Sequence, residues 1–234
     1  MANEDGMPSG SVDNFRADQN PLGTRGEVLV SVVIPAYNCA QYIAQTLESI
    51  LTQTFSHYEI VVVNDGSPDT ASLETAVAPY RTRIRYLAQE TRGPGGARNT
   101  GIVEARGKYV AFLDADDFWA PDHLAKQMAL LGRDLSLELV YSDSILLKDE
   151  KPVARAFQME PQRGAVTFES LLTEDCAIST SSTVVSREAI LRNGLFDESF
   201  LRCEDFDMWL RMAFQGTRIG YHRDATVFHR LLGR

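Results

Sequence analysis

The sequence contains few cysteines and none of the cysteine patterns of small secreted or zinc-binding domains. Only Cys39, Cys176 and Cys203 occur among 234 residues, and no two of them form a C-x-x-C pair. An odd count without paired spacing is a poor basis for a disulfide framework or a structural zinc site. We therefore expect a protein of a reducing compartment whose cysteines behave as small buried apolar residues.

Two further absences concern membranes and nucleic acids. No apolar run reaches the roughly 20 residues of a membrane-spanning helix, and the N-terminus lacks the basic-then-apolar pattern of a signal peptide. The formal net charge of -9 repels the phosphate backbone of nucleic acids. The sequence predicts a soluble, cytoplasmic protein that does not bind nucleic acid, and it leaves the oligomeric state open.

What the sequence does contain is a long, regularly patterned region behind a polar leader. Residues 1–26 are rich in Gly, Pro, Asn and Asp and show no hydrophobic period, which is typical of disorder. A hydrophobic content of 44% over this length is enough for one sizeable core. We interpret residues 27–234 as a single domain, with one half over 27–117 and a second, less regular half over 118–234.

Strand and helix patterns alternate along this region. Short β-branched runs predict strands at residues 28–34 and 59–63, and further strands are predicted at 84–88, 109–113 and 137–141. Apolar residues at helical spacing predict helices at residues 42–52, 73–80 and 121–131. Such alternation is typical of βαβ units, so the predicted fold class is α/β, with a mostly parallel central sheet flanked by helices.

Beyond residue 148 the pattern weakens. A charged stretch at 149–164 has no clear period. Helices are predicted at residues 168–173, 187–193 and 204–215, and short strands at 183–185, 219–221 and 225–228.

Polar residues follow three predicted strands directly, at residues 35–38, 64–67 and 114–117. Ligands of open α/β sheets bind outside the carboxyl ends of the strands. Because three separate elements deliver polar groups to the same edge, the sequence predicts one binding site there.

The acidic run that begins at Asp114 is the most informative of these clusters. Side chains two apart on an extended segment point the same way, so Asp114 and Asp116 can face one small volume. Two carboxylates suit Mg²⁺ or Mn²⁺, with diphosphate oxygens completing the coordination shell. The alternative is an acidic turn that caps the helix predicted from Pro121, and Asp117 could cap while Asp116 binds metal.

A glycine-rich segment at residues 92–99 carries Arg92 and Arg98. It has neither the G-K-[ST] ending of a P-loop nor the position of a dinucleotide fingerprint. Its glycines are consistent with a flexible turn that leads into a helix, or with a backbone that approaches a ligand. Arg98, beside acidic loops, is expected to form an ion pair or a phosphate contact.

Two more sets of residues have a structural and a functional interpretation. Glu204 and Asp205 lie at a predicted helix start, where the helix dipole favours acidic residues, and one of them could instead be a general base. His229, and less so His222, could be a third metal ligand or a structural residue. His123 is expected on the surface of its helix.

With these residues in view, the sequence resembles the family 2 glycosyltransferases of the GT-A fold. Six segments match in family order: VVIPAYN at 32–38, VVVNDGS at 61–67, GARNTG at 96–101, VAFLDADD at 110–117, GLFDE at 194–198 and EDFDMWLR at 204–211. They cover roughly residues 28–229. The Gln-x-x-Arg-Trp motif of processive members is absent, so we expect a non-processive enzyme or a fragment of one.

The resemblance implies a nucleotide site. Its residues would be Pro35, Ala36, Tyr37, Asn38 and Asp65, with Asp65 at the edge of the base.

The resemblance also implies the remaining roles. Arg98 would lie near the phosphates, Asp114 and its neighbour Ala115 at the ribose, and Asp116 on the divalent metal, with His229 as a further ligand. Asp205, paired in sequence with Glu204, would deprotonate the acceptor hydroxyl.

The activity expected from the resemblance is inverting transfer from a nucleotide sugar, most often a UDP-sugar, with Mn²⁺ or Mg²⁺. The acceptor would be a glycan or lipid-linked hydroxyl, and the protein could associate peripherally with the cytoplasmic face of a membrane. One alternative is a nucleotidyltransferase, but the lysine-containing glycine loop of that class is missing after the first strand. The other is a non-catalytic nucleotide- or glycan-binding module, and intact Asp114, Asp116 and Asp205 argue against it.

Overall fold

The computed structural model describes residues 27–160, 162–200 and 202–232. The leader predicted at residues 1–26 lies outside the described residues. The strands are β1 (Val30–Ala36), β2 (Tyr58–Asp65), β3 (Arg85–Gln89), β4 (Tyr109–Phe112), β5 (Phe118–Trp119), β6 (Leu139–Lys148), β7 (Lys151–Arg155), β8 (Val184–Ser186) and β9 (Ile219–Arg230). The α-helices are α1 (Ile43–Leu51), α2 (Thr70–Val77), α3 (Gly93–Glu104), α4 (His123–Arg133), α5 (Ala156–Met159), α6 (Phe168–Leu172), α7 (Arg187–Arg192) and α8 (Glu204–Phe214). Two 3₁₀ turns complete the elements, η1 (Ala78–Tyr80) and η2 (Thr180–Ser182).

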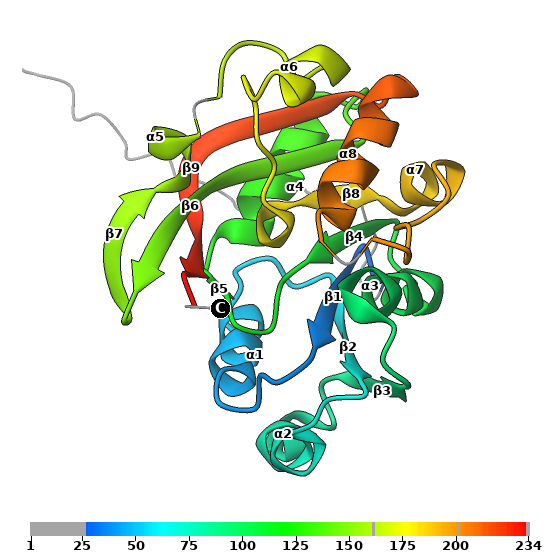
Figure 1. Cartoon of the computed structure of the whole chain (residues 1–234), viewed down its shortest axis with the longest axis vertical. Coiled ribbons are helices and arrows are strands. Elements are labelled where there is room, and N and C mark those ends of the chain that lie inside the picture. Colours follow the sequence, from blue (N-terminus) through cyan, green and yellow to red (C-terminus); the bar gives the residue numbers. More distant parts are fainter. Residues whose placement is uncertain (1–26, 161, 201, 233–234) are drawn as a thin grey trace, which may run out of the picture.

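The strands form one sheet in the order β3-β2-β1-β4-β8-β6-β9-β5, and β7 pairs with β6 (Figure 1). Strands β3, β2, β1 and β4 pair in parallel. Strand β8 is antiparallel to both β4 and β6, so β6 and its parallel partner β9 run in the direction of β1. The prediction of a mostly parallel α/β sheet is therefore confirmed.

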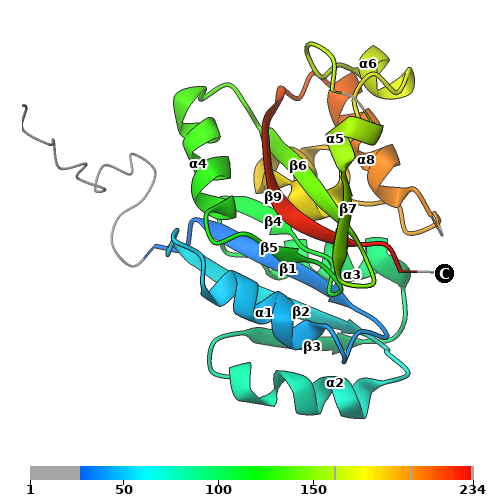
Figure 2. The same ribbon diagram turned by 90° about the vertical axis from the view of Figure 1, so that its left-hand side faces the viewer.

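Helices cover both faces of the sheet (Figure 2). One apolar core lies beneath α1, α2 and α4, and the other beneath α3, α7 and α8. Strand β1 shows why the first strands read as unbroken apolar runs: Val32 and Ile34 enter the first core, and Val33 enters the second. Both faces of a parallel strand are buried in this architecture, so both sets of side chains are apolar.

The structure differs from the prediction in several segments. The stretch at 149–164 contains the β-hairpin strand β7 and the short helix α5. The two short strands expected at 219–221 and 225–228 are one strand, β9, whose pairing with β6 shifts register on either side of Asp143. The glycine-rich segment is itself the beginning of α3.

In the part of the chain that the structure describes, no helix is long and apolar enough to cross a membrane.

Candidate active site

A cavity of about 1060 Å³ lies where β1, β2 and β4 end. Its wall includes the segments after β1 and β4, the last residue of β2, and the first turns of α3 and α8. Small-molecule sites are usually of this size and position in α/β proteins. Nearly all of the predicted site residues line it: Pro35, Ala36, Tyr37, Asn38, Asp65, Arg98, Asp114, Ala115, Asp116, Glu204 and Asp205.

On the side of β1 and β2, the cavity combines an exposed ring with a fixed carboxylate. The Tyr37 side chain is 55% exposed. Asp65 is buried, and its Oδ1 accepts hydrogen bonds from Gln89 Nε2 at 2.7 Å and from the Arg92 amide at 2.8 Å. Both bonds go to Oδ1, and Asp65 itself lines the cavity. Gln89, on β3, had no sequence signal because its role depends on the pairing of β3 with β2.

Arg98 is buried between the acidic run that begins at Asp114 and the acidic pair Glu204-Asp205. Its side chain is 5% exposed, and its guanidinium donates to Asp114 Oδ1 at 2.8 Å and to Glu204 Oε1 at 2.6 Å. Burial by itself would lower the pKa of Arg98, but the charges of Asp114 and Glu204 raise it above its usual range. The structure thus shows Arg98 in ion pairs, which is one of the two roles expected from the sequence.

The adjacent acidic residues Glu204 and Asp205 have different surroundings. The Glu204 side chain is buried and engaged by Arg98. Asp205 is only partly buried, and its carboxylate accepts from Thr180 Oγ1 at 2.7 Å and from the Phe206 amide at 2.8 Å. Asp205 is thus the better placed of the two to reach a substrate hydroxyl.

Asp117 does not cap a helix, contrary to one sequence interpretation. Helix α4 begins after Asp122, and no side chain caps it. The fully buried Asp117 carboxylate instead accepts from Ser181 Oγ at 2.6 Å and from the Arg230 amide at 3.0 Å, and lies 2.9 Å from His229 Nδ1. A short strand, β5, separates the acidic run from α4, and its pairing with β9 had no signal in the local sequence.

His229 does not line the cavity, but its contact with Asp117 holds it close to the acidic run at residues 114–117. The hydrogen bond to Asp117 raises its pKa to about 9 against the opposing effect of burial, and the charges of Asp117, Asp114 and Asp116 act in the same upward direction. Because Asp117 engages Nδ1, Nε2 is the ring nitrogen left to bind a metal, and it would first have to lose the proton that the raised pKa keeps on the ring.

The described residues do not form a self-contained metal site, because no group of three His, Cys, Asp or Glu side chains among them has the required geometry. Asp116 and His229 could supply the protein ligands of a cation that also needs ligands from a substrate. Mg²⁺ and Mn²⁺ are often bound by one or two protein ligands together with substrate phosphates. The donor set therefore suits a cation that is shared with a bound diphosphate.

The other helical and strand histidines lie away from the cavity. His123, expected at the surface, is fully buried, stacks on Trp119 at 4.3 Å between ring centroids, and lies 2.7 Å from Thr226 Oγ1. The expectation was wrong because β9 packs over this face of α4.

Arg230 is a site residue that sequence reasoning did not identify. Its buried guanidinium donates to the carbonyl of Asp116, to Gln45 Oε1 at 2.6 Å and to Glu150. It also lies 4.9 Å from the ring centroid of Phe118. Arg230 thereby fixes the backbone of the acidic loop, and its only sequence signal was its position next to His229.

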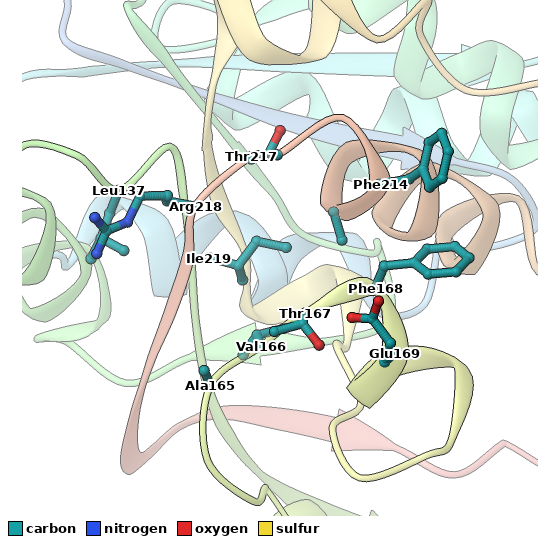
Figure 3. A pocket seen from close by; sticks show the side chains of 12 residues that line it. Leu137, Ala165, Val166, Thr167, Phe168, Glu169, Phe214, Thr217, Arg218 and Ile219 are labelled. Carbon is teal, nitrogen blue, oxygen red and sulfur yellow. The ribbon is translucent and has the colours of Figure 1, made fainter.

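A second cavity, of about 610 Å³, lies between α6 and the connection from α8 to β9 (Figure 3). The rings of Phe168 and Phe214 pack edge to face at its rim, 5.4 Å apart. None of the predicted site residues lines it. Of these two cavities, the larger one is therefore the candidate active site.

Comparison with known proteins identifies the family of this chain. The sequence profile of glycosyl transferase family 2 matches residues 31–155. An uncharacterized glycosyltransferase of Rickettsia prowazekii (strain Madrid E) is 32% identical over 211 residues, which is 87% of this chain and 64% of that protein. The UDP-Glc:alpha-D-GlcNAc-diphosphoundecaprenol beta-1,3-glucosyltransferase WfgD of Escherichia coli is 29% identical over 185 residues, which is 79% of this chain and 69% of WfgD.

Solved structures share the fold. S. aureus TarS 1-349 in complex with UDP superposes with a TM-score of 0.72 at 24% identity, over 87% of this chain and 60% of TarS 1-349. The mannosyltransferase PcManGT from Pyrobaculum calidifontis, in complex with GDP-Man and Mn²⁺, gives a TM-score of 0.69 at 24% identity, over 89% of this chain and 58% of PcManGT. The chain spans 31% of the length of a Rickettsia felis relative and 64% of the length of the Rickettsia prowazekii protein.

The profile match covers more than half of the chain, and the fold is that of GT-A enzymes. The chain therefore belongs to glycosyl transferase family 2 and is a glycosyltransferase domain with the GT-A fold.

Proposed function

We propose that this domain transfers a sugar from a nucleoside diphosphate sugar to a hydroxyl group of a glycan or lipid-linked acceptor, with inversion at the anomeric carbon. The favoured donor is a UDP-sugar. The observation that carries the proposal is the cavity that brings Asp65, Asp116 and Asp205 together from three distant segments. Family membership favours this activity over nucleotidyl transfer and over binding without turnover.

The nucleotide would bind between the ends of β1 and β2. The exposed Tyr37 ring offers a face for stacking on the base. Asp65 Oδ2 would accept a hydrogen bond from a base N–H group, which uridine presents at its edge. Asp114, whose Oδ1 accepts from Arg98, would accept a hydrogen bond from a ribose hydroxyl.

The diphosphate would lie between α3 and the acidic loop. Gly93 and Pro94, in the first turn of α3, line the cavity, and helix N-termini attract phosphate through their free amides and dipole. Asp116 and His229 would hold Mn²⁺ or Mg²⁺, which neutralises the negative charge of a departing diphosphate. The names of the solved relatives mention UDP, and GDP-Man with Mn²⁺, which supports this assignment.

The acceptor would approach from the N-terminus of α8. Asp205 would take the proton of its hydroxyl as the acceptor oxygen bonds to the anomeric carbon and the bond from that carbon to the diphosphate breaks. Attack from the face opposite to the leaving group inverts the configuration in one displacement. The name of WfgD specifies a diphosphoundecaprenol-linked acceptor, and a similar acceptor would bring this domain to the cytoplasmic face of a membrane.

Calorimetric titration with UDP, GDP and dTDP, each with and without Mn²⁺, tests the proposal. We expect one nucleotide to bind tightly only when the metal is present. Binding of none of them under either condition would overturn the donor assignment. Binding that is unaffected by Mn²⁺ and Mg²⁺ would overturn the metal assignment alone.

A further inference from the structure

A serine- and threonine-rich turn forms hydrogen bonds with both acidic segments of the cavity, the run that begins at Asp114 and the pair Glu204-Asp205. It comprises η2 and its flanking residues Ser179 and Thr183. Thr180 Oγ1 donates to Asp205 Oδ2 at 2.7 Å. The next residue, Ser181, donates to Asp117 Oδ2 at 2.6 Å and accepts from the Asp114 amide at 3.1 Å. Adjacent hydroxyls therefore hold the candidate base on one side and the acidic loop on the other.

The turn is held rigidly by three neighbouring elements. Trp119 Nε1, on β5, donates to the carbonyl of Ser181 at 2.8 Å, and Gln127 Nε2, on α4, donates to the carbonyl of Ser182 at 2.7 Å. The Phe112 amide, on β4, donates to the carbonyl of Thr183 at 3.3 Å. Thr180 itself is buried, and a β-branched side chain in such a place keeps one rotamer. The turn can therefore define where its hydroxyl groups lie.

Asp205 needs an external partner because of its position in α8. It is the second residue of the helix, after Cys203 in the left-handed conformation (φ 61°) and Glu204. The first-turn amides of a helix lack backbone partners and attract carboxylates. One Asp205 oxygen already accepts from the Phe206 amide at 2.8 Å. Thr180 donates to the other oxygen, so each carboxylate oxygen of Asp205 has its own hydrogen-bond donor.

The charges around Asp205 make a neutral donor suitable. Arg98, on α3, lies near it but is bonded to Asp114 and Glu204. Arg202 also lines the cavity. A cation bonded directly to Asp205 would favour the carboxylate over its protonated form and weaken it as a base. A hydroxyl group fixes the orientation of the carboxylate and leaves its net charge in place.

We propose that Thr180 is a positioning residue of the transfer reaction, which orients the Asp205 carboxylate toward the acceptor hydroxyl. This inference rests on the proposed role of Asp205 as the base. Thr180 acts through Asp205 and is not assigned any contact with substrate.

The test uses Thr180→Val, which removes the hydroxyl and nearly preserves the shape of the side chain. Turnover is measured as release of nucleoside diphosphate from the donor sugar whose nucleotide binds in the calorimetric titration. We expect kcat to fall roughly 10- to 100-fold, because small misplacements of catalytic groups have effects of that order. The donor KM and the affinity for the nucleotide with Mn²⁺ should not change, and Thr180→Ser should restore most of kcat.

Thr183→Val is the matched control. Its hydroxyl is in the same turn and donates to the carbonyl of Thr180 at 2.8 Å, but it does not contact Asp205. If the loss of kcat merely reflects a loosened turn, Thr183→Val will reduce kcat as much as Thr180→Val does, and the proposal is wrong. Equal kcat for Thr180→Val and the wild type would also overturn it.

The Asp205→Asn variant separates this proposal from the one on which it rests. Wild-type turnover by Asp205→Asn would remove the base assignment and the role of Thr180 with it. If Asp205→Asn is inactive while Thr180→Val is normal, only the role of Thr180 fails. If both are impaired, adding Thr180→Val to Asp205→Asn should produce no further loss, since residues that act as a unit are not additive.

Discussion

Arg98 Nη1 lies 2.6 Å from Glu204 Oε1, and this buried ion pair joins helix α3 to the first turn of α8. The other Nη nitrogen of Arg98 is bonded to Asp114 at the end of β4. One guanidinium thus holds together the acidic loop and the segment that presents Asp205. Gly95, in the first turn of α3, packs beside Glu204, and a Cβ atom there would lie 3.5 Å from Glu204 Cγ, an ordinary van der Waals distance.

Arg98→Met should destabilise the fold by about 3 to 5 kcal/mol, because it leaves buried carboxylates without their partner. The free energy of unfolding in urea measures this. Arg92→Met is the matched control, since Arg92 pairs with Glu198 at 2.5 Å but its side chain is 48% exposed. An exposed pair is worth about 1 kcal/mol or less. Equal losses in the two variants would contradict the structural role given to Arg98.

Asp205→Asn should lower turnover by roughly 100-fold or more if its carboxylate is the general base. Its affinity for the nucleotide with Mn²⁺ should stay the same, because the proposed nucleotide site is formed by other residues of the cavity. Glu204→Gln provides the comparison: it removes a charge next to Asp205 and weakens the Arg98 pair, so it should affect stability more than Asp205→Asn does. Full turnover by Asp205→Asn would exclude Asp205 as the base.

Asp116→Ala should abolish the Mn²⁺-dependent part of nucleotide binding with little loss of stability, because Asp116 lies at the cavity wall. Calorimetry with and without Mn²⁺, together with thermal melting, measures both effects. Asp122→Ala removes a carboxylate from an exposed position before α4 and should leave nucleotide binding intact. Undiminished Mn²⁺ dependence in Asp116→Ala would contradict the metal assignment.

His229→Gln should weaken Mn²⁺ binding in the presence of saturating nucleotide by roughly 10- to 100-fold, the range observed when residues around a metal are replaced. Metal titration of the nucleotide complex measures this. If His229 serves only to pair with Asp117, the variant will lose stability and keep its affinity for Mn²⁺.

His123 should make the protein less stable in acid. Burial holds its pKa well below 6.5, with the charges of His222 and Lys126 acting in the same direction. The unfolded chain therefore binds a proton at His123 below about pH 6.5 that the folded protein does not bind. This contribution to stability is fully present above pH 6.5 and is lost as the pH falls, by up to about 1.4 kcal/mol per pH unit.

Urea unfolding between pH 5 and 8 tests this effect. In His123→Gln the slope of stability against pH below 6.5 should be smaller than in the wild type, and the two curves should run parallel above pH 7. His222, whose pKa burial also lowers, will leave a residual slope. Identical slopes in both proteins would show that His123 takes up its proton in the folded state.

The regular half of the fold could be predicted because its signals are local. Strands β1, β2 and β4 are largely buried and appear as short runs dominated by apolar residues, and α1 shows helical spacing of Ile43, Leu47 and Ile50. The less regular half was harder to predict, because β7 and much of β9 are partly exposed and carry polar residues. A strand of that kind forms through pairing with β6, and pairing partners are distant in sequence.

The sequence by itself determined the α/β class, the polar clusters that follow the strands, and the order of motifs that resembles family 2 glycosyltransferases. Tertiary structure decided how neighbouring acidic residues differ. Asp116 lies at the cavity while Asp117 is buried against His229, and Glu204 is paired with Arg98 while Asp205 is held by Thr180. The environment of a carboxylate depends on partners 25 to 112 residues away in the chain, and only the folded packing brings those partners within hydrogen-bonding distance.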